Sequence, residues 1–271
     1  ISLSRHLCFC LNSGEHYRVH MNENSEIIAS EIIVIQSLSV TDYKTGESLY
    51  NDILRYKNIK DKTVFSSFFD VFDKKEFKTV LDSLVHNMKD GHVVTLHLET
   101  HGCDDGIGLA SGEVILWKEF FECIRPINEK MFNLLLVVMS MCKGAAISSL
   151  LEPQKRAPYR AFVGFENNMK VCTLLDAFND FYDSYNNILD LPFAFKQMND
   201  SLDENEKAWC LRSSDVFDLV LNPNSINEDI VDKYYNIEKN NFASKEDFKN
   251  HICDYFKNSS MKYRNYYNFK D

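Results

Sequence analysis

The sequence has 271 residues, of which 45% are hydrophobic, and this is enough for one domain with a substantial core. Its formal net charge is −10 and no cluster of Lys and Arg interrupts that balance, so we expect no direct binding to nucleic acid. The longest apolar run, at residues 134–141, is too short to cross a membrane, and no charged-then-apolar signal segment opens the sequence, so we expect a cytoplasmic protein without membrane contact.

The first predicted element is a β-hairpin at residues 5–21, where polarity alternates around an Asn-Ser-Gly turn. Cys8 and Cys10 would share one face of a strand there, and a metal site with His6 or His20 is an alternative. Structural zinc normally uses two paired cysteine motifs, which this sequence lacks. We therefore favour a plain strand, read the eight scattered cysteines as reduced thiols, and expect neither a metal nor another cofactor.

The middle of the chain alternates between apolar runs rich in β-branched residues and segments with helical spacing. The expected strands are residues 31–35, 64–72, 93–100, 134–141, 161–165 and 209–212, and the expected helices lie near residues 48–56, 74–89, 144–147 and 174–189. Asp73 can cap the second helix, because its carboxylate can accept from the free amides of the first turn. This order predicts an α/β fold with a mainly parallel sheet, right-handed crossovers and helices on both faces.

The end of the chain differs in composition from the rest. Residues 226–271 are polar and rich in aromatic side chains, with Ile230, Tyr234 and Ile237 at helical spacing. We therefore expect one domain over residues 1–225, with the hairpin at its start, and a helical appendage or docking surface over residues 226–271.

Two apolar runs end in reactive residues. Residues 93–100 lead into His101 and Gly102, and residues 134–141 lead into Cys142. Catalytic groups gather where the strands of a parallel sheet end, so the histidine and the cysteine would lie at one edge of the same sheet. An imidazole beside a thiol can remove the thiol proton and later give it to a leaving amine. The pair predicts the catalytic dyad of a cysteine peptidase.

The residues around these strand ends resemble a known family. The two blocks are Leu-His-Leu-Glu-Thr-His-Gly at residues 96–102 and Val-Val-Met-Ser-Met-Cys-Lys-Gly-Ala at residues 137–145. They resemble the catalytic blocks of caspase-like (clan CD) cysteine peptidases, closest to the prokaryotic CHAT branch and similar also to separase. Residues 104–117 are similar to the hairpin that follows the histidine in that family. The resemblance spans about residues 28–220, and it implies a caspase-like fold, a protein substrate, a regulatory partner or subunit, and an effector role in prokaryotic defence or signalling.

We assign Cys142 as the nucleophile and His101 as the base. Cys142 precedes a predicted helix start, whose amide dipoles favour a thiolate, and Lys143 adds positive charge. The alternative is an ordinary core cysteine at a strand end. His97 and His92 compete with His101, but His97 would lie deeper in the sheet and His92 at the start of the strand.

The remaining site residues follow from the resemblance. It implies an oxyanion hole made by the amides of Gly102 and Cys142, and a substrate pocket lined by Asp42 and Ser140, with the histidine held largely by backbone. A carboxylate at Asp42 would favour Arg or Lys in the substrate. The alternative is that Asp42 is an exposed turn residue.

Two classes of function stay open at this point. The first is a cysteine endopeptidase that cleaves a protein substrate under the control of a partner. The second is a non-catalytic interaction module built on the same sheet, in which His101 and Cys142 are idle. Iodoacetamide separates the two, because an activated Cys142 would react selectively near neutral pH.

Overall fold

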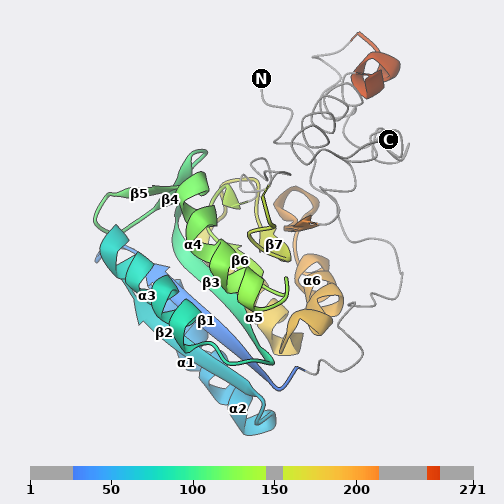
Figure 1. Ribbon diagram of the computed structural model, residues 1–271. Helices are drawn as coiled ribbons and strands as arrows, with labels where there is room; N and C mark the ends of the chain where they lie inside the picture. The colour runs from blue at the N-terminus through green and yellow to red at the C-terminus, as the bar shows by residue number, and fades with distance from the viewer. Residues whose placement is uncertain (1–26, 145–154, 214–242, 251–271) are drawn as a thin grey trace, which may run out of the picture.

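One sheet organises the part of the chain that the computed structural model describes, which is residues 27–144, 155–213 and 243–250. Its main strands are β1 (Ala29–Ser37), β2 (Val64–Asp70), β3 (His92–Gly102), β6 (Leu136–Ser140), β7 (Ala161–Gly164) and β8 (Trp209–Arg212). They lie in the order β2-β1-β3-β6-β7-β8 (Figure 1). The first five of these are parallel and β8 is antiparallel to β7, which confirms the predicted mainly parallel sheet.

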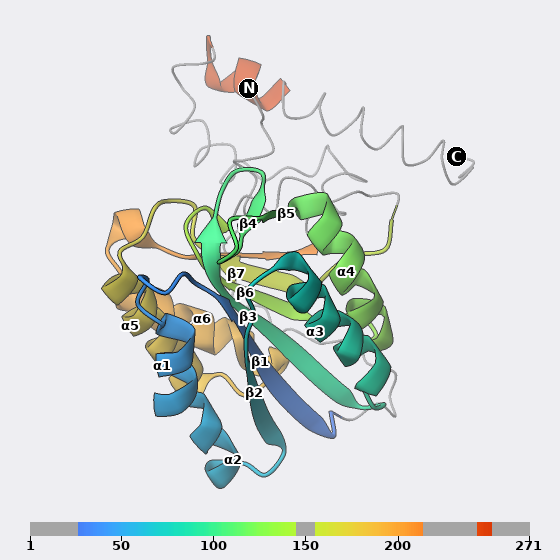
Figure 2. The same ribbon diagram turned by 90° about the vertical axis from the view of Figure 1, so that its left-hand side faces the viewer.

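Helices cover both faces of this sheet, as the alternation of the sequence predicts. They are α1 (Thr45–Asp52), α2 (Lys57–Lys60), α3 (Lys74–Asn87), α4 (Trp117–Lys130), α5 (Val171–Ser184) and α6 (Leu191–Asp200), with short 3-10 turns η2 (Leu54–Tyr56), η4 (Ile188–Asp190) and η5 (Glu204–Glu206). Figure 2 shows α1, α5 and α6 on one face and α3 and α4 on the other. The described elements therefore form three layers.

Helix α3 shows how local sequence sets the elements. The Asp73 carboxylate accepts a hydrogen bond of 2.9 Å from the backbone N–H of Glu76, which confirms the predicted cap. Phe77 and Leu81, one helical turn apart, are both fully buried. The helix therefore begins where the sequence predicts and buries its apolar stripe against the rest of the core.

Strand β3 lies between β1 and β6 and carries the first predicted catalytic block. Residues 93–100 of this strand are buried, whereas His101 is exposed and Gly102 is half-buried. The chain then turns into the short hairpin of β4 (Gly106–Gly108) and β5 (Val114–Leu116), which pairs with the end of β3 as expected. The sheet thus presents the end of its central strand at one edge.

Some expectations fall outside the described residues. These are the hairpin of residues 5–21 with its four candidate metal ligands, the helix expected to open at residues 144–147, of which only Gly144 is described, and most of the appendage at residues 226–271. Among the residues that are described, no helix combines the length and the apolar character needed to cross a membrane.

Candidate active site

The pairing of β3 with β6 brings the two predicted catalytic blocks to the same place. These strands run parallel, and their pairing continues as far as Ser140. Just beyond it, the Thr100 hydroxyl donates to Met141 Sδ at 3.6 Å, so the two segments stay in contact after the strand pairing ends. The segments that carry His101 and Cys142 therefore begin side by side.

Gly102 shows how closely the blocks approach. A Cβ atom on Gly102 would lie 1.9 Å from the carbonyl oxygen of Cys142 and 3.0 Å from Met141 Cγ. The first of these distances is far shorter than any tolerated contact, so only glycine allows the two backbones to pack in this way. The structure therefore brings His101, Gly102 and Cys142 together at one edge of the sheet.

Cys142 lies in the turn that follows β6, where its residue is half-buried. The next residue, Lys143, has a φ of 58° in the left-handed region. Its Nζ lies 3.3 Å from Asp104 Oδ1, so an ion pair joins the turn after β6 to the turn after β3. The positive charge that the sequence places beside the thiol is therefore shared with Asp104.

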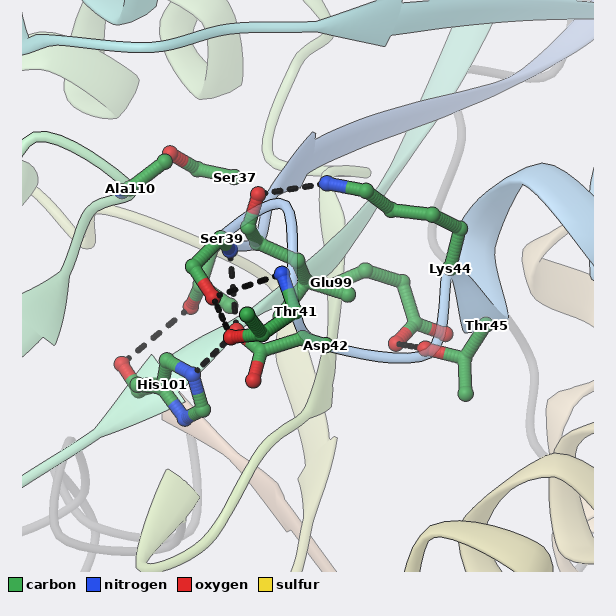
Figure 3. A network of polar contacts seen from close by, with 11 residues as sticks. Ser37, Ser39, Thr41, Asp42, Lys44, Thr45, Glu99, His101 and Ala110 are labelled. Atoms are coloured by element: carbon green, nitrogen blue, oxygen red, sulfur yellow. Dashed lines mark hydrogen bonds and ion pairs between the residues drawn. The ribbon is translucent and has the colours of Figure 1, made fainter.

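His101 has a carboxylate partner that the sequence analysis did not expect. Its Nε2 lies 2.9 Å from Asp42 Oδ2. Figure 3 shows this contact as a dashed line between the two side chains. The side chains are 65% and 29% exposed. Asp42 Oδ2 also accepts a hydrogen bond of 2.8 Å from the backbone N–H of Ser39. The hydrogen bond from His101, followed by those from Ser39, holds the pKa of Asp42 below its usual 3.8. Asp42 is therefore an ionised acceptor at neutral pH.

The loop that carries Asp42 is tied to the sheet. Thr45 begins α1, and its buried hydroxyl donates to Glu99 Oε2 at 2.5 Å. Within the loop, Lys44 Nζ donates to the carbonyl of Leu38 at 2.5 Å (Figure 3). Glu99 lies on β3 two residues before His101, so the loop meets this strand at two points. These contacts fix where the Asp42 carboxylate lies.

A second histidine of β3, His97, lies inside the core. Its Nε2 is 2.9 Å from Glu99 Oε1 and its Nδ1 is 3.0 Å from the Tyr182 hydroxyl of α5. All three side chains are buried, and burial raises the pKa of Tyr182 well above its usual 10. His97 is thus a buried core residue, as its position in the strand predicts. His92 lies at the opposite end of β3 from His101.

Ser140 and Asp42, the predicted pocket residues, occupy different environments. Ser140 is 3% exposed, and its hydroxyl has no hydrogen-bond partner within residues 27–144, 155–213 and 243–250. Asp42 borders a surface cleft of about 460 Å³ that Glu47 and Asp52 also line. A role for either residue in substrate binding stays a prediction.

The oxyanion hole likewise stays a prediction, although the residues expected to form it, Gly102 and Cys142, are in contact. Over the described parts of the chain, no three His, Cys, Asp or Glu side chains gather closely enough to hold a metal ion. The reactive groups described at this edge are the Cys142 thiol, the His101 imidazole and the Asp42 carboxylate.

The same edge also contains the contact that the sequence analysis missed. Asp42 and His101 are 59 positions apart, and only the neighbouring positions of β1 and β3 in the sheet could have suggested that they meet.

A comparison of the chain with protein-family models finds no match, and a comparison with curated protein sequences also finds none.

Proposed function

We propose that the chain is a cysteine endopeptidase in which Cys142 is the nucleophile and His101 the general base. The observation that supports this most directly is the packing of Gly102 against the Cys142 carbonyl, because it brings the two segments that carry His101 and Cys142 to one edge of the sheet. The half-burial of Cys142 and the exposure of His101 leave room for a polypeptide to reach this edge.

The reaction would proceed in two stages. His101 takes the proton of the Cys142 thiol, the thiolate attacks the carbonyl carbon of the scissile bond, and the imidazolium returns the proton to the leaving amine. Water then adds to the resulting thioester with His101 again acting as base, which releases the new carboxyl end and the free thiol. The amides of Gly102 and Cys142 would donate to the oxyanion in both stages.

The substrate and the biological setting are part of the same proposal. We expect a protein substrate, and the carboxylate of Asp42 beside the cleft leads us to expect cleavage after Arg or Lys rather than after Asp. The resemblance to the CHAT branch leads us to expect a cytoplasmic effector of a prokaryotic defence or signalling system, controlled by a partner domain or subunit.

A pair of cysteine variants tests the assignment. Purified Cys142→Ala should fold like the unaltered chain and cleave no member of a peptide library, because the substitution removes the nucleophile and little packing. Cys172→Ala is the matched control, since Cys172 is an exposed cysteine on α5. It should retain full activity. Cleavage that survives in Cys142→Ala, with host proteases excluded, would disprove the role of Cys142.

Alkylation adds a test that needs no substrate. An activated Cys142 should react with iodoacetamide near neutral pH faster than Cys172, although Cys172 is the more exposed of the two. Equal labelling of both residues, together with no cleavage by the unaltered chain, would instead support a non-catalytic interaction module.

A further inference from the structure

We propose that Asp42 is a positioning residue for the catalytic base, holding His101 by Nε2 so that Nδ1 is the nitrogen that receives the proton of Cys142. This inference rests on the proposed function and extends it to a third residue and to one atom of the imidazole. Its starting point is the 2.9 Å contact between His101 Nε2 and Asp42 Oδ2.

The chemistry of the two groups assigns the hydrogen. A carboxylate can only accept, so the nitrogen that faces Asp42 carries the N–H. In the neutral ring the lone pair is then on Nδ1, which makes Nδ1 the basic atom. When the thiol proton arrives there, the positive charge of the imidazolium lies against the negative charge of Asp42. The carboxylate thus stabilises the ring in the state that the reaction requires.

The carboxylate is itself held in place, which a positioning residue requires. Asp42 Oδ2 accepts from the Ser39 N–H at 2.8 Å, and the Asp42 N–H donates to the Ser39 carbonyl at 3.1 Å. The following helix is fastened by the buried bond of 2.5 Å from Thr45 to Glu99. Glu99 precedes His101 by two residues on β3, so the strand that presents the ring also anchors the loop that presents the carboxylate.

This role competes with the expectation that Asp42 selects basic substrates. The Asp42 oxygen nearest His101 already accepts two hydrogen bonds, one from the ring and one from Ser39. A residue that contacts the substrate changes the preference among substrates, whereas a residue that acts through the base changes the turnover of every substrate. The two roles therefore predict different kinetics for the same substitution.

The kinetic test compares the unaltered chain with Asp42→Asn and Asp42→Glu, using peptides with Arg, Lys, Asp or Leu before the scissile bond. Asp42→Asn should lower kcat by about 10- to 100-fold for every one of these peptides that the unaltered chain cleaves and change KM little, and Asp42→Glu should recover part of the loss. Asp52→Asn removes the same charge from the same cleft without touching His101, so it should leave the kcat for the Leu peptide within about twofold.

A second measurement does not depend on turnover. In Cys142→Ala chains labelled with ¹⁵N-histidine, the ring nitrogens of His101 report which of them carries the hydrogen, and His101→Ala assigns their signals. At a pH where the ring is neutral, we expect the Nε2–H tautomer with Asp42 present. In Asp42→Asn we expect a larger share of the Nδ1–H tautomer, because an amide can donate to Nε2.

The outcomes separate the two proposals. A loss confined to the Arg and Lys peptides, or a tautomer that Asp42→Asn leaves unchanged, overturns the positioning role even if the chain is a peptidase. A chain that cleaves nothing overturns the proposed function, and the tautomer measurement still decides whether Asp42 orients His101.

Discussion

Strand β3 carries three histidines, and two of them, His97 and His101, each have a carboxylate 2.9 Å from Nε2. The pair of His97 and Glu99 lies in the core, with side chains 0% and 4% exposed. The pair of His101 and Asp42 lies at the end of the strand, with side chains 65% and 29% exposed. The contacts are alike in geometry and differ in their access to water.

Because of that difference, we expect the buried pair to contribute to stability and the exposed pair to contribute to catalysis. When one partner of a buried polar pair is removed, water cannot reach the other partner to replace the lost hydrogen bond. The stability of the fold therefore depends on both partners. An exposed pair exchanges its hydrogen bonds with water at little cost, so it contributes little to stability but remains within reach of a substrate. We therefore expect the buried part of β3 to hold the sheet together and its exposed end to carry the reaction.

Substitution of the two histidines should produce opposite effects. His101→Ala should lower kcat by about 10²–10⁴-fold, because the base is lost, while the free energy of unfolding stays within about 0.5 kcal/mol. His97→Ala should lower the free energy of unfolding by about 2–4 kcal/mol, because it leaves a cavity and unpaired polar groups, while the folded fraction keeps its kcat. Urea denaturation and steady-state kinetics measure both. If His97→Ala loses its kcat while fully folded, the division between the two regions is wrong.

The carboxylates should differ in the same direction. Glu99→Ala should cost about 3–5 kcal/mol of unfolding free energy, because Glu99 is buried and holds both His97 and Thr45. Asp42→Ala should cost about 0–1 kcal/mol, because its pair with His101 is exposed. Thermal or urea unfolding of the two variants side by side checks this. Equal losses would show that exposure does not decide the role of each pair.

Gly102 lies at the exposed end of β3, yet its backbone should tolerate no side chain. Gly102→Ala should cost about 1–3 kcal/mol and abolish cleavage, because the added Cβ would push β3 away from the Cys142 carbonyl. Gly108→Ala is the control, since its Cβ would lie 3.4 Å from His101 Cβ, an ordinary contact. It should fold with less than about 1 kcal/mol of loss. A stable, active Gly102→Ala would mean that the two blocks are farther apart than described.

The smallest expected effect is on the pH dependence of stability. The folded pKa of Asp42 lies below its usual 3.8, so its contribution is present above pH 3.8 and is lost as the pH falls through the lowered folded value. Unfolding curves of the unaltered chain and of Asp42→Asn should therefore differ slightly at neutral pH and converge in strong acid. A difference that grows as the pH falls would have the wrong sign for this carboxylate.

Local signals in the sequence predicted much of the fold. The Asp73 cap, the helix that follows it and the central strands all depend on residues close together in the chain, and the structure confirms them. That the segments carrying His101 and Cys142 end at the same edge follows from the rule that parallel strands end at the same side of a sheet.

Local sequence signals cannot predict contacts between residues that are far apart in the sequence. The bonds from Thr45 to Glu99 and from His97 to Tyr182 join residues 54 and 85 positions apart, and they depend on how α1 and α5 pack on the sheet. The contact between Asp42 and His101 belongs to the same class. Periodicity gives the face on which a side chain lies but not the partner that it meets there.

Lys143 constrains which sequences can follow Cys142. Glycine readily adopts the φ of 58° of Lys143 and asparagine tolerates it, but a side chain branched at Cβ would collide with its own backbone. In a library randomised at this position and selected for cleavage, we expect Gly and Asn to be recovered and Val and Ile to be lost. The positive φ would thus limit which residues can replace Lys143, whereas the charge that pairs with Asp104 could be gained or lost.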